Sequence, residues 1–210
     1  MRSADATTII RVLLIIFVAY LIIYKFNPFV IAILIGIAIL LDAIDGFFAL
    51  HEASHGKINF GKYVAGLRGD PKAKAEVAAV KKTLKKKAKY GARMDVAGDR
   101  AVEYILWITF VYTGVVPIFV LFLVVIRHSF VDAVMAAKGT SSKMKTGFAK
   151  AVYSSNIGRG FVNVVKFVTF AYLPFVYISG YPIIVGYVLV TVLVAYIMLR
   201  GAAELYESFA

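Results

Sequence analysis

Long apolar stretches constrain this chain more than any other feature. Each is close to the length of about 20 residues that a helix needs to cross a bilayer. They cover roughly residues 8–25, 28–50, 97–116, 117–137, 160–179 and 182–200. Because 61% of the 210 residues are hydrophobic, a water-soluble domain could not bury this much apolar surface. The sequence therefore predicts an all-α, polytopic membrane protein with six transmembrane helices in a single domain over residues 1–210.

The positive charge is concentrated in two segments. Of the 24 Lys and Arg residues, 12 lie between residues 51 and 94, and another six lie between residues 138 and 166. Cytoplasmic loops of membrane proteins are enriched in Lys and Arg. We therefore expect the protein to lie in the cell membrane with both segments on the cytoplasmic side. Both termini are expected on that side too.

The larger basic segment, residues 51–90, is predicted to be a cytoplasmic insertion between the second and third transmembrane helices. Its centre, residues 70–89, has the composition of a basic helix. Two interpretations stay open, because such a helix can lie on anionic lipid headgroups or cover an active site. No aromatic residues alternate with the lysines, so no nucleic-acid partner is expected.

Four aspartates stand at the edges of apolar stretches. Asp42 and Asp45 end the second stretch, and Asp95 and Asp99 open the third. Ionisable groups at such positions are costly, and the spacings of three and four residues put each pair on one helix face. Four carboxylates brought together would repel one another unless cations lie between them. Because the chain has no cysteine and offers hard oxygen ligands, a site for Mg²⁺ or Mn²⁺ is predicted, with two ions suited to displacement at phosphorus. The alternative is that the aspartates only form ion pairs with neighbouring arginines.

The arrangement Asp-x-x-Asp-Gly-x-x-Ala, followed by Gly-x-x-x-Asp-x-x-x-Asp, resembles the signature of the CDP-alcohol phosphotransferase family. In this chain it consists of Asp42, Asp45, Gly46, Ala49, Gly91, Asp95 and Asp99. Near the N-terminus, Thr8 and Arg11 are similar to part of the family's Asn-x-x-Thr-x-x-Arg, with Asp5 where Asn is usual. Two departures are visible. Leu50 stands where the family has Arg, and a long basic insertion separates the two halves of the signature.

The resemblance implies a membrane enzyme of phospholipid synthesis that acts as a homodimer. It would transfer a phosphatidyl-type group from a CDP-lipid, CDP-diacylglycerol or CDP-archaeol, to a polar alcohol and release CMP. Asp42, Asp45 and Asp95 would bind the two metal ions, and Asp99 would approach the metal and act as the general base. The residues implied to line the nucleotide are Thr8, Asp42, Gly46, Ala49, Gly91 and Arg93. Either Arg93 or a lysine of the insertion would replace the missing arginine.

A second group of basic residues indicates the acceptor. The segment Gly139-x-x-x-Lys143-x-Lys145-Thr146 looks like one found in family members that use phosphorylated alcohols, such as glycerol phosphate or inositol phosphate. Converging Lys and Arg side chains bind phosphomonoesters well. The candidate acceptor residues are Arg127, Lys143, Lys145, Arg159 and Lys166. For the loop lysines, ordinary cytoplasmic loop charge is the open alternative.

Parts of the sequence are also compatible with two other function classes. His51-Glu52-x-x-His55 matches the zinc-binding pattern of metalloproteases, which needs both histidines on one helix face. A non-catalytic transporter or scaffold is the other class. A transporter would be expected to keep its ionisable groups near the middle of the membrane, whereas here they gather at the ends of apolar stretches.

Overall fold

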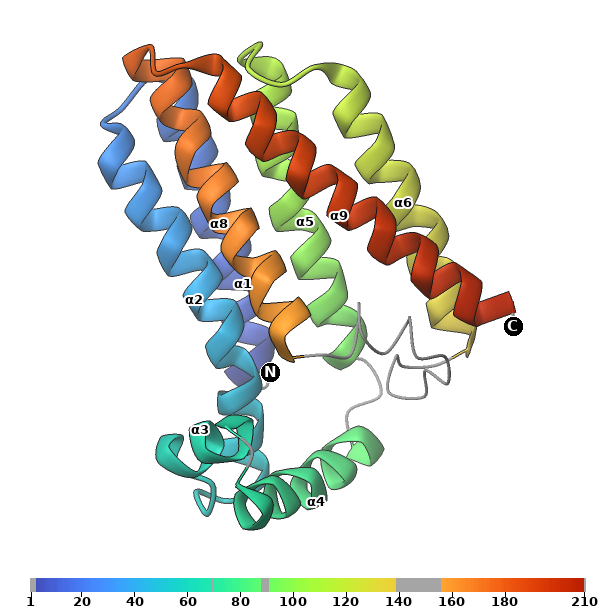
Figure 1. Ribbon diagram of the computed structural model, residues 1–210. Helices are drawn as coiled ribbons and strands as arrows, with labels where there is room; N and C mark the ends of the chain where they lie inside the picture. Colours follow the sequence, from blue (N-terminus) through green and yellow to red (C-terminus); the bar gives the residue numbers. More distant parts are fainter. Residues whose placement is uncertain (1–2, 69, 88–90, 139–155, 210) are drawn as a thin grey trace. The chain divides into compact units, whose positions relative to one another are not determined.

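The computed structural model describes residues 3–68, 70–87, 91–138 and 156–209. Within these ranges the regular secondary structure is α-helical and contains no strand, which confirms the all-α prediction. The helices are α1 (Ser3–Ile23), α2 (Pro28–Ala53), α3 (Phe60–Arg68), α4 (Pro71–Lys87), α5 (Gly91–Tyr112), α6 (Ile118–Lys138), α8 (Asn156–Ser179) and α9 (Ile183–Phe209) (Figure 1).

Five of the described helices are long and apolar enough to cross a membrane, namely α1, α2, α6, α8 and α9. They coincide with five of the six predicted stretches. The length and composition of these helices indicate a membrane protein. Helix α5 contains most of the remaining stretch but is not among the five. It carries several charged residues, among them Asp95, Asp99 and Glu103.

The helix boundaries follow the turn residues of the sequence. Asn27 caps α2, because the backbone N–H of Phe29 donates to Oδ1 of Asn27 at 2.9 Å. Pro28 occupies the first helical position, where its missing N–H costs nothing. Gly114 and Gly180 follow the ends of α5 and α8 with φ angles of 74° and 70°, a conformation that glycine adopts without strain.

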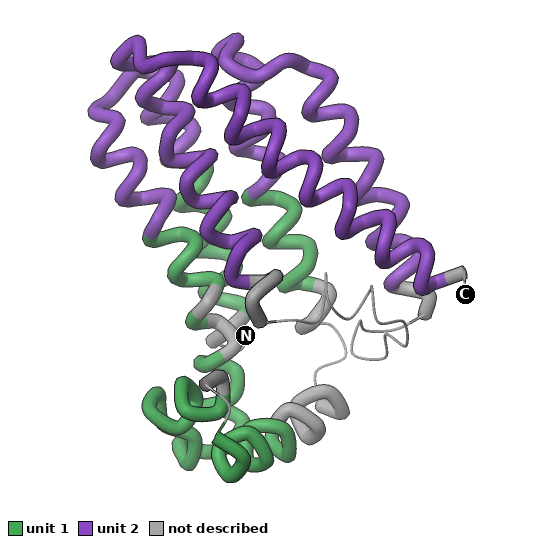
Figure 2. The backbone as a smooth tube through the Cα atoms, viewed as in Figure 1, with its two compact units in different colours: residues 1–16, 37–102 green, residues 17–36, 103–210 purple. Residues whose placement is uncertain are grey.

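The chain divides into two compact units (Figure 2). The first unit comprises residues 1–16 and 37–102, and therefore contains the start of α1, the end of α2, helices α3 and α4, and the first half of α5. The second unit comprises residues 17–36 and 103–210. Within the first unit α3 packs against α4, and within the second unit α9 packs against both α6 and α8.

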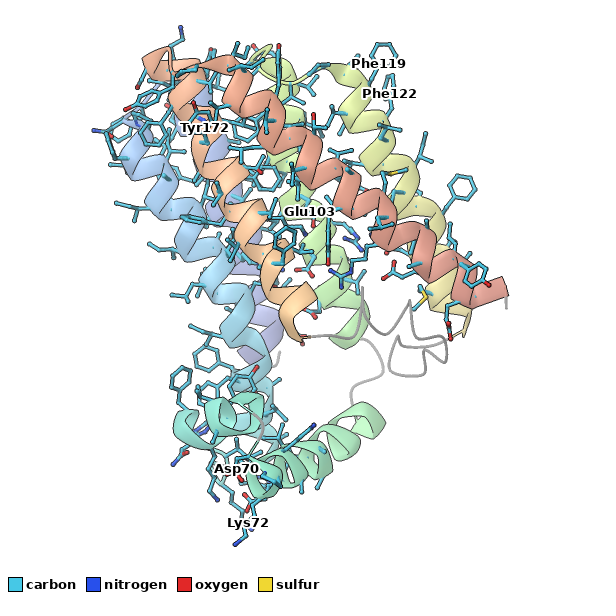
Figure 3. The ribbon with its side chains drawn as sticks, viewed as in Figure 1. Asp70, Lys72, Glu103, Phe119, Phe122 and Tyr172 are labelled. Atoms are coloured by element: carbon cyan, nitrogen blue, oxygen red, sulfur yellow. The ribbon has the colours of Figure 1, made fainter. Side chains whose placement is uncertain are left out.

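A buried aromatic cluster lies in the second unit. Trp107 and Phe110 of α5 lie against Phe170 of α8, with ring centroids 5.0 and 6.2 Å apart, respectively. Trp107 and Phe110 are fully buried. By contrast, large apolar side chains such as Phe119 and Phe122 of α6 are exposed and project outward (Figure 3). An apolar outer surface of this kind is what a helix presents to lipid.

Candidate functional site

Three of the four aspartates come together in the first unit. Asp42 lies in the second half of α2, about three turns before its end, and Asp95 and Asp99 lie on successive turns of α5. One carboxylate oxygen from each residue lies within 4.8 Å of the corresponding oxygens of the other two. Asp45 follows Asp42 on the same helix, and its side chain lies outside the described residues. Three hard anionic ligands at this separation fit Mg²⁺ or Mn²⁺ by their chemistry.

Arg11 of α1 belongs to the same cluster. Its Nη1 donates to Oδ1 of Asp42 and its Nη2 donates to Oδ1 of Asp99. The Arg11 side chain is only 2% exposed, so its positive charge is directed to these two carboxylates rather than to solvent. A planar guanidinium can bridge two carboxylates in this way because its donors form a rigid fork. Arg11 therefore supplies a counter-charge within the cluster.

The surroundings of Asp95 disfavour its negative charge. Solvent reaches part of its side chain, but desolvation of the carboxyl group raises the pKa of Asp95 above its ordinary value, and the neighbouring Asp99 raises it further. The Arg11 guanidinium acts in the opposite direction. A divalent cation among the three carboxylates would relieve the remaining repulsion, so the electrostatics agree with the ligand chemistry.

A close approach of two helices brings Arg11 to the aspartates. Thr8 of α1 is buried against Gly98 of α5, and a Cβ atom at position 98 would overlap Cγ2 of Thr8. Arg11 is one turn beyond Thr8, and Asp99 is next to Gly98. The absence of a side chain at Gly98 thus allows the spacing between α1 and α5 on which the Arg11 contact depends.

We predict that Gly98→Ala destabilises the protein by about 1–3 kcal/mol, because the added methyl group overpacks the contact with Thr8. Adding Thr8→Ser should recover most of that loss, since serine keeps the hydroxyl group and removes Cγ2. Thermal unfolding in detergent measures both effects. Gly160→Ala is the matched control, because no atom lies within 4 Å of a Cβ built at Gly160. Equal unfolding temperatures for Gly98→Ala and Gly160→Ala would contradict the close-approach argument.

The residues predicted to line a nucleotide lie on these same helices. Thr8 is buried at the contact between α1 and α5, and Ala49 is partly buried near the end of α2. Gly46 lies in α2, and Gly91 and Arg93 lie in the first turn of α5, with the Arg93 side chain outside the described residues. Leu50, at the position of the family arginine, is 1% exposed and contributes to packing.

Two of the predicted acceptor residues are paired with buried glutamates in the second unit. Nη2 of Arg127 in α6 donates to Oε2 of Glu204 in α9 at 2.9 Å. Nζ of Lys166 in α8 donates to Oε1 of Glu103 in α5, and Nε2 of His128 lies 3.5 Å from the other oxygen of Glu103. Glu103, labelled in Figure 3, is 4% exposed, and Glu204 is 3% exposed.

Neither glutamate was singled out from the sequence. Glu204 lies beyond residue 200, where the last apolar stretch was expected to end, although α9 continues to Phe209. The signal was Arg127 itself, because an arginine inside an apolar stretch requires a partner. Of the other predicted acceptor residues, Lys143 and Lys145 lie outside the described residues, and Arg159 is in the first turn of α8 with its side chain also outside them.

The two histidines of the metalloprotease pattern do not share a helix face. His51 is in the last turn of α2, and its Nδ1 lies 2.8 Å from the carbonyl oxygen of Ile58. His55 follows the end of that helix and has a φ angle of 51°. The helical geometry on which a zinc site of this pattern depends is therefore absent here.

Comparison of the chain with protein-family models, with curated proteins and with solved structures gave no match.

Proposed function

We propose that this protein is a divalent-metal-dependent membrane enzyme that transfers a phosphatidyl-type group from a CDP-lipid to a polar alcohol and releases CMP. The observation that carries the proposal is the cluster of Asp42, Asp95 and Asp99, whose ligand oxygens lie within 4.8 Å of one another. Asp95 and Asp99 lie in the first three turns of α5, where the sequence predicts a membrane edge. Carboxylates at such an edge suit a reaction between a lipid-anchored donor and a water-soluble acceptor, because the two substrates meet at the membrane boundary.

The donor set fits Mg²⁺ or Mn²⁺ held by Asp42, Asp95 and Asp99, with Asp45 as the further ligand that the sequence predicts. Bound there, the metal would neutralise the pyrophosphate of the donor and stabilise the charge that develops on the leaving CMP. The role of the protein is to hold three anionic side chains at a separation that favours a cation. Arg11 contributes by orienting Asp42 and Asp99 through one guanidinium.

Asp99 is the residue that we assign as general base. Its carboxylate takes the proton from the hydroxyl group of the acceptor, and the acceptor oxygen forms a new bond to the phosphorus that carries the lipid. The bond between that phosphorus and the bridging oxygen breaks, and CMP leaves with the bonding electrons. Because Oδ1 of Asp99 accepts from Arg11, the other carboxylate oxygen is the one assigned to the acceptor hydroxyl.

An apolar groove beside the cluster supports a lipid donor. It has a volume of about 260 Å³ and is lined only by residues of α1 and α5. Its lining residues include Thr8, which lies one helical turn before Arg11, and Gly98, which immediately precedes Asp99. A groove of this composition accommodates a hydrocarbon chain while the headgroup reaches the carboxylates.

We infer that the acceptor is a phosphorylated alcohol, either glycerol phosphate or inositol phosphate, bound through Lys143, Lys145 and Arg159, because Arg127 and Lys166 are already paired with Glu204 and Glu103. The proposal includes a sixth membrane span formed by α5, an active site that faces the cytoplasm, and a homodimer. The basic segments support that orientation, because positively charged loops are retained in the cytoplasm.

The proposal is tested with purified protein in nanodiscs that contain a CDP-lipid. CMP release is measured by liquid chromatography with Mg²⁺ and, in separate reactions, glycerol phosphate, inositol phosphate, serine or inositol. We expect rapid CMP release with one phosphorylated acceptor and none after EDTA treatment. No acceptor-dependent release across the panel, with both CDP-diacylglycerol and CDP-archaeol, would contradict the proposed function.

The acceptor assignment gives a separate prediction. Replacing both Lys143 and Lys145 with alanine should raise the KM for the phosphorylated acceptor about 10-fold or more, since each lysine would contribute a charge-assisted hydrogen bond. The KM for the CDP-lipid should change much less. Lys150→Ala is the matched control, because it removes a lysine of the same segment outside the motif. An equal rise in both KM values would show that these lysines do not select the acceptor.

A further inference from the structure

Helices α3 and α4 form a helical hairpin within the first unit. Asn59 caps the start of α3, because the backbone N–H of Lys62 donates to Oδ1 of Asn59 at 2.9 Å. Asp70 begins α4 in the same way, accepting from the N–H of Lys72 at 3.1 Å, and Pro71 takes the first helical position. Both helix starts are thus specified by local sequence, and the hairpin is a defined element of the insertion.

The apolar side of α4 is used inside this hairpin. Ala73 is 6% exposed. A Cβ atom built on Gly66 of α3 would lie 3.4 Å from the carbonyl carbon of Ala73. Val77 and Val80, which follow Ala73 at helical spacing, are partly buried. Lys62 of α3 and Glu76 of α4 add an ion pair of 3.1 Å across the two helices. The apolar stripe of α4 is therefore packed within the hairpin, and the exposed side of α4 is a different one.

The sequence of the hairpin is strongly basic. Between Phe60 and Lys87 the chain has nine Lys or Arg residues and only two acidic ones. One of those two acidic residues, Glu76, is already paired with Lys62. Lys72 and Lys74 are exposed, and Lys72 points away from the hairpin (Figure 3). A surface with this excess of positive charge attracts an extended anionic partner.

Exposed aromatic side chains connect the hairpin to the end of α2. The Phe47 ring lies 5.7 Å from that of Phe48 and 5.4 Å from that of Phe60, measured between centroids. Phe48 is 40% exposed and Phe60 is 56% exposed. Helix α2 is one of the candidate membrane spans and ends at Ala53, so only a short segment separates it from α3. The hairpin is therefore tethered close to a membrane boundary.

We infer that the α3–α4 hairpin is a docking surface for the anionic lipid headgroups of the bilayer that α2 enters. Three observations select this partner: the charge is complementary, exposed phenylalanines accompany it, and the tether keeps the hairpin near the membrane. Lysines near an anionic leaflet are attracted to it, and aromatic rings insert at the boundary between headgroups and acyl chains. This inference does not depend on the proposed enzymatic activity.

The absence of cysteine from the chain permits a direct test. Ala78→Cys places a single thiol on an exposed position of α4, where a fluorescent label can be attached. The full-length labelled protein is placed in nanodiscs that carry a nitroxide quencher on the lipid headgroup. We expect quenching to be about twofold or more stronger in discs containing phosphatidylglycerol than in discs of phosphatidylcholine alone. It should return toward the phosphatidylcholine value in about 1 M NaCl, where the Debye length is about 3 Å.

Charge variants separate this effect from changes in folding. Lys72→Gln with Lys74→Gln should reduce the lipid-dependent quenching, whereas Lys72→Arg with Lys74→Arg should retain it. Glu76→Gln, which removes the ion pair with Lys62 but adds net positive charge, should retain or increase the quenching. Quenching that is equal in the two lipid compositions, or that resists salt, would overturn the inference. So would a response of the label to added transfer RNA with no response to phosphatidylglycerol, which would identify a nucleic-acid partner instead.

Discussion

Asp99→Asn is expected to lower the rate of CMP release by about 10²- to 10⁴-fold, because an amide cannot accept the proton of the acceptor hydroxyl group. Asparagine has nearly the same shape as aspartate, so the packing of α5 should be preserved. The variant is compared with the wild type in nanodiscs at saturating CDP-lipid, acceptor and Mg²⁺. Saturating Mg²⁺ is needed because Asp99 also belongs to the metal cluster. If added Mg²⁺ restored the rate of CMP release, the loss of rate would come from weaker metal binding alone.

Asp70→Asn is the matched control for this experiment. It makes the same chemical change at the start of α4, and asparagine caps a helix as well as aspartate does. Its activity should equal that of the wild type. Full activity of Asp99→Asn would exclude Asp99 as the base and would remove the central assignment of the mechanism.

The buried pair between Arg127 and Glu204 should produce the largest change in stability. Their side chains are 7% and 4% exposed, so removing one partner takes a buried counter-charge away from the other. Such a loss typically costs about 3–5 kcal/mol. We therefore expect Arg127→Ala and Glu204→Ala each to lower the free energy of unfolding strongly, as measured by denaturation in detergent.

Removing both charges should be far less damaging. Arg127→Met with Glu204→Met replaces the pair by apolar groups of similar volume and should recover most of the lost stability. Lys62→Ala is the matched control, because its partner Glu76 is 54% exposed and such surface pairs contribute about 1 kcal/mol or less. A double variant as unstable as either alanine variant would contradict the buried-pair account. If the double variant folds but binds the acceptor weakly, Arg127 serves the acceptor as well as the fold.

Much of the helical architecture could be predicted because it depends on local sequence. Asn27-Pro28, Gly114 and Gly180 mark the breaks between apolar stretches, and α2 begins, and α5 and α8 end, at or within two residues of them. The basic helix was also predicted close to its observed bounds. Helix α3 was not, because Phe60–Arg68 is short and contains two glycines, which gives weak local helical preference. Its packing against α4 depends on tertiary contacts.

The same distinction holds for the site: spacing along one helix could be predicted, whereas contacts between helices could not. Helical spacing placed Asp95 and Asp99 on one face of α5, and the structure brings Asp42 beside them. The role of Arg11 could not be derived from spacing, because it depends on the close approach of Thr8 to Gly98. Likewise, Arg127 signalled a missing partner, but only the packing of α6 against α9 identifies Glu204.

The fate of the lipid-linked phosphorus tests the central claim most directly. A CDP-lipid isotopically labelled at that phosphorus is incubated in nanodiscs with the wild-type protein, Mg²⁺ and the phosphorylated acceptor, and the products are analysed by mass spectrometry. We predict that the label appears in a new lipid joined to the acceptor, together with an equal amount of unlabelled CMP. Label in phosphatidic acid or its ether-linked counterpart, or an unchanged CDP-lipid despite a folded protein with bound Mg²⁺, would contradict the account.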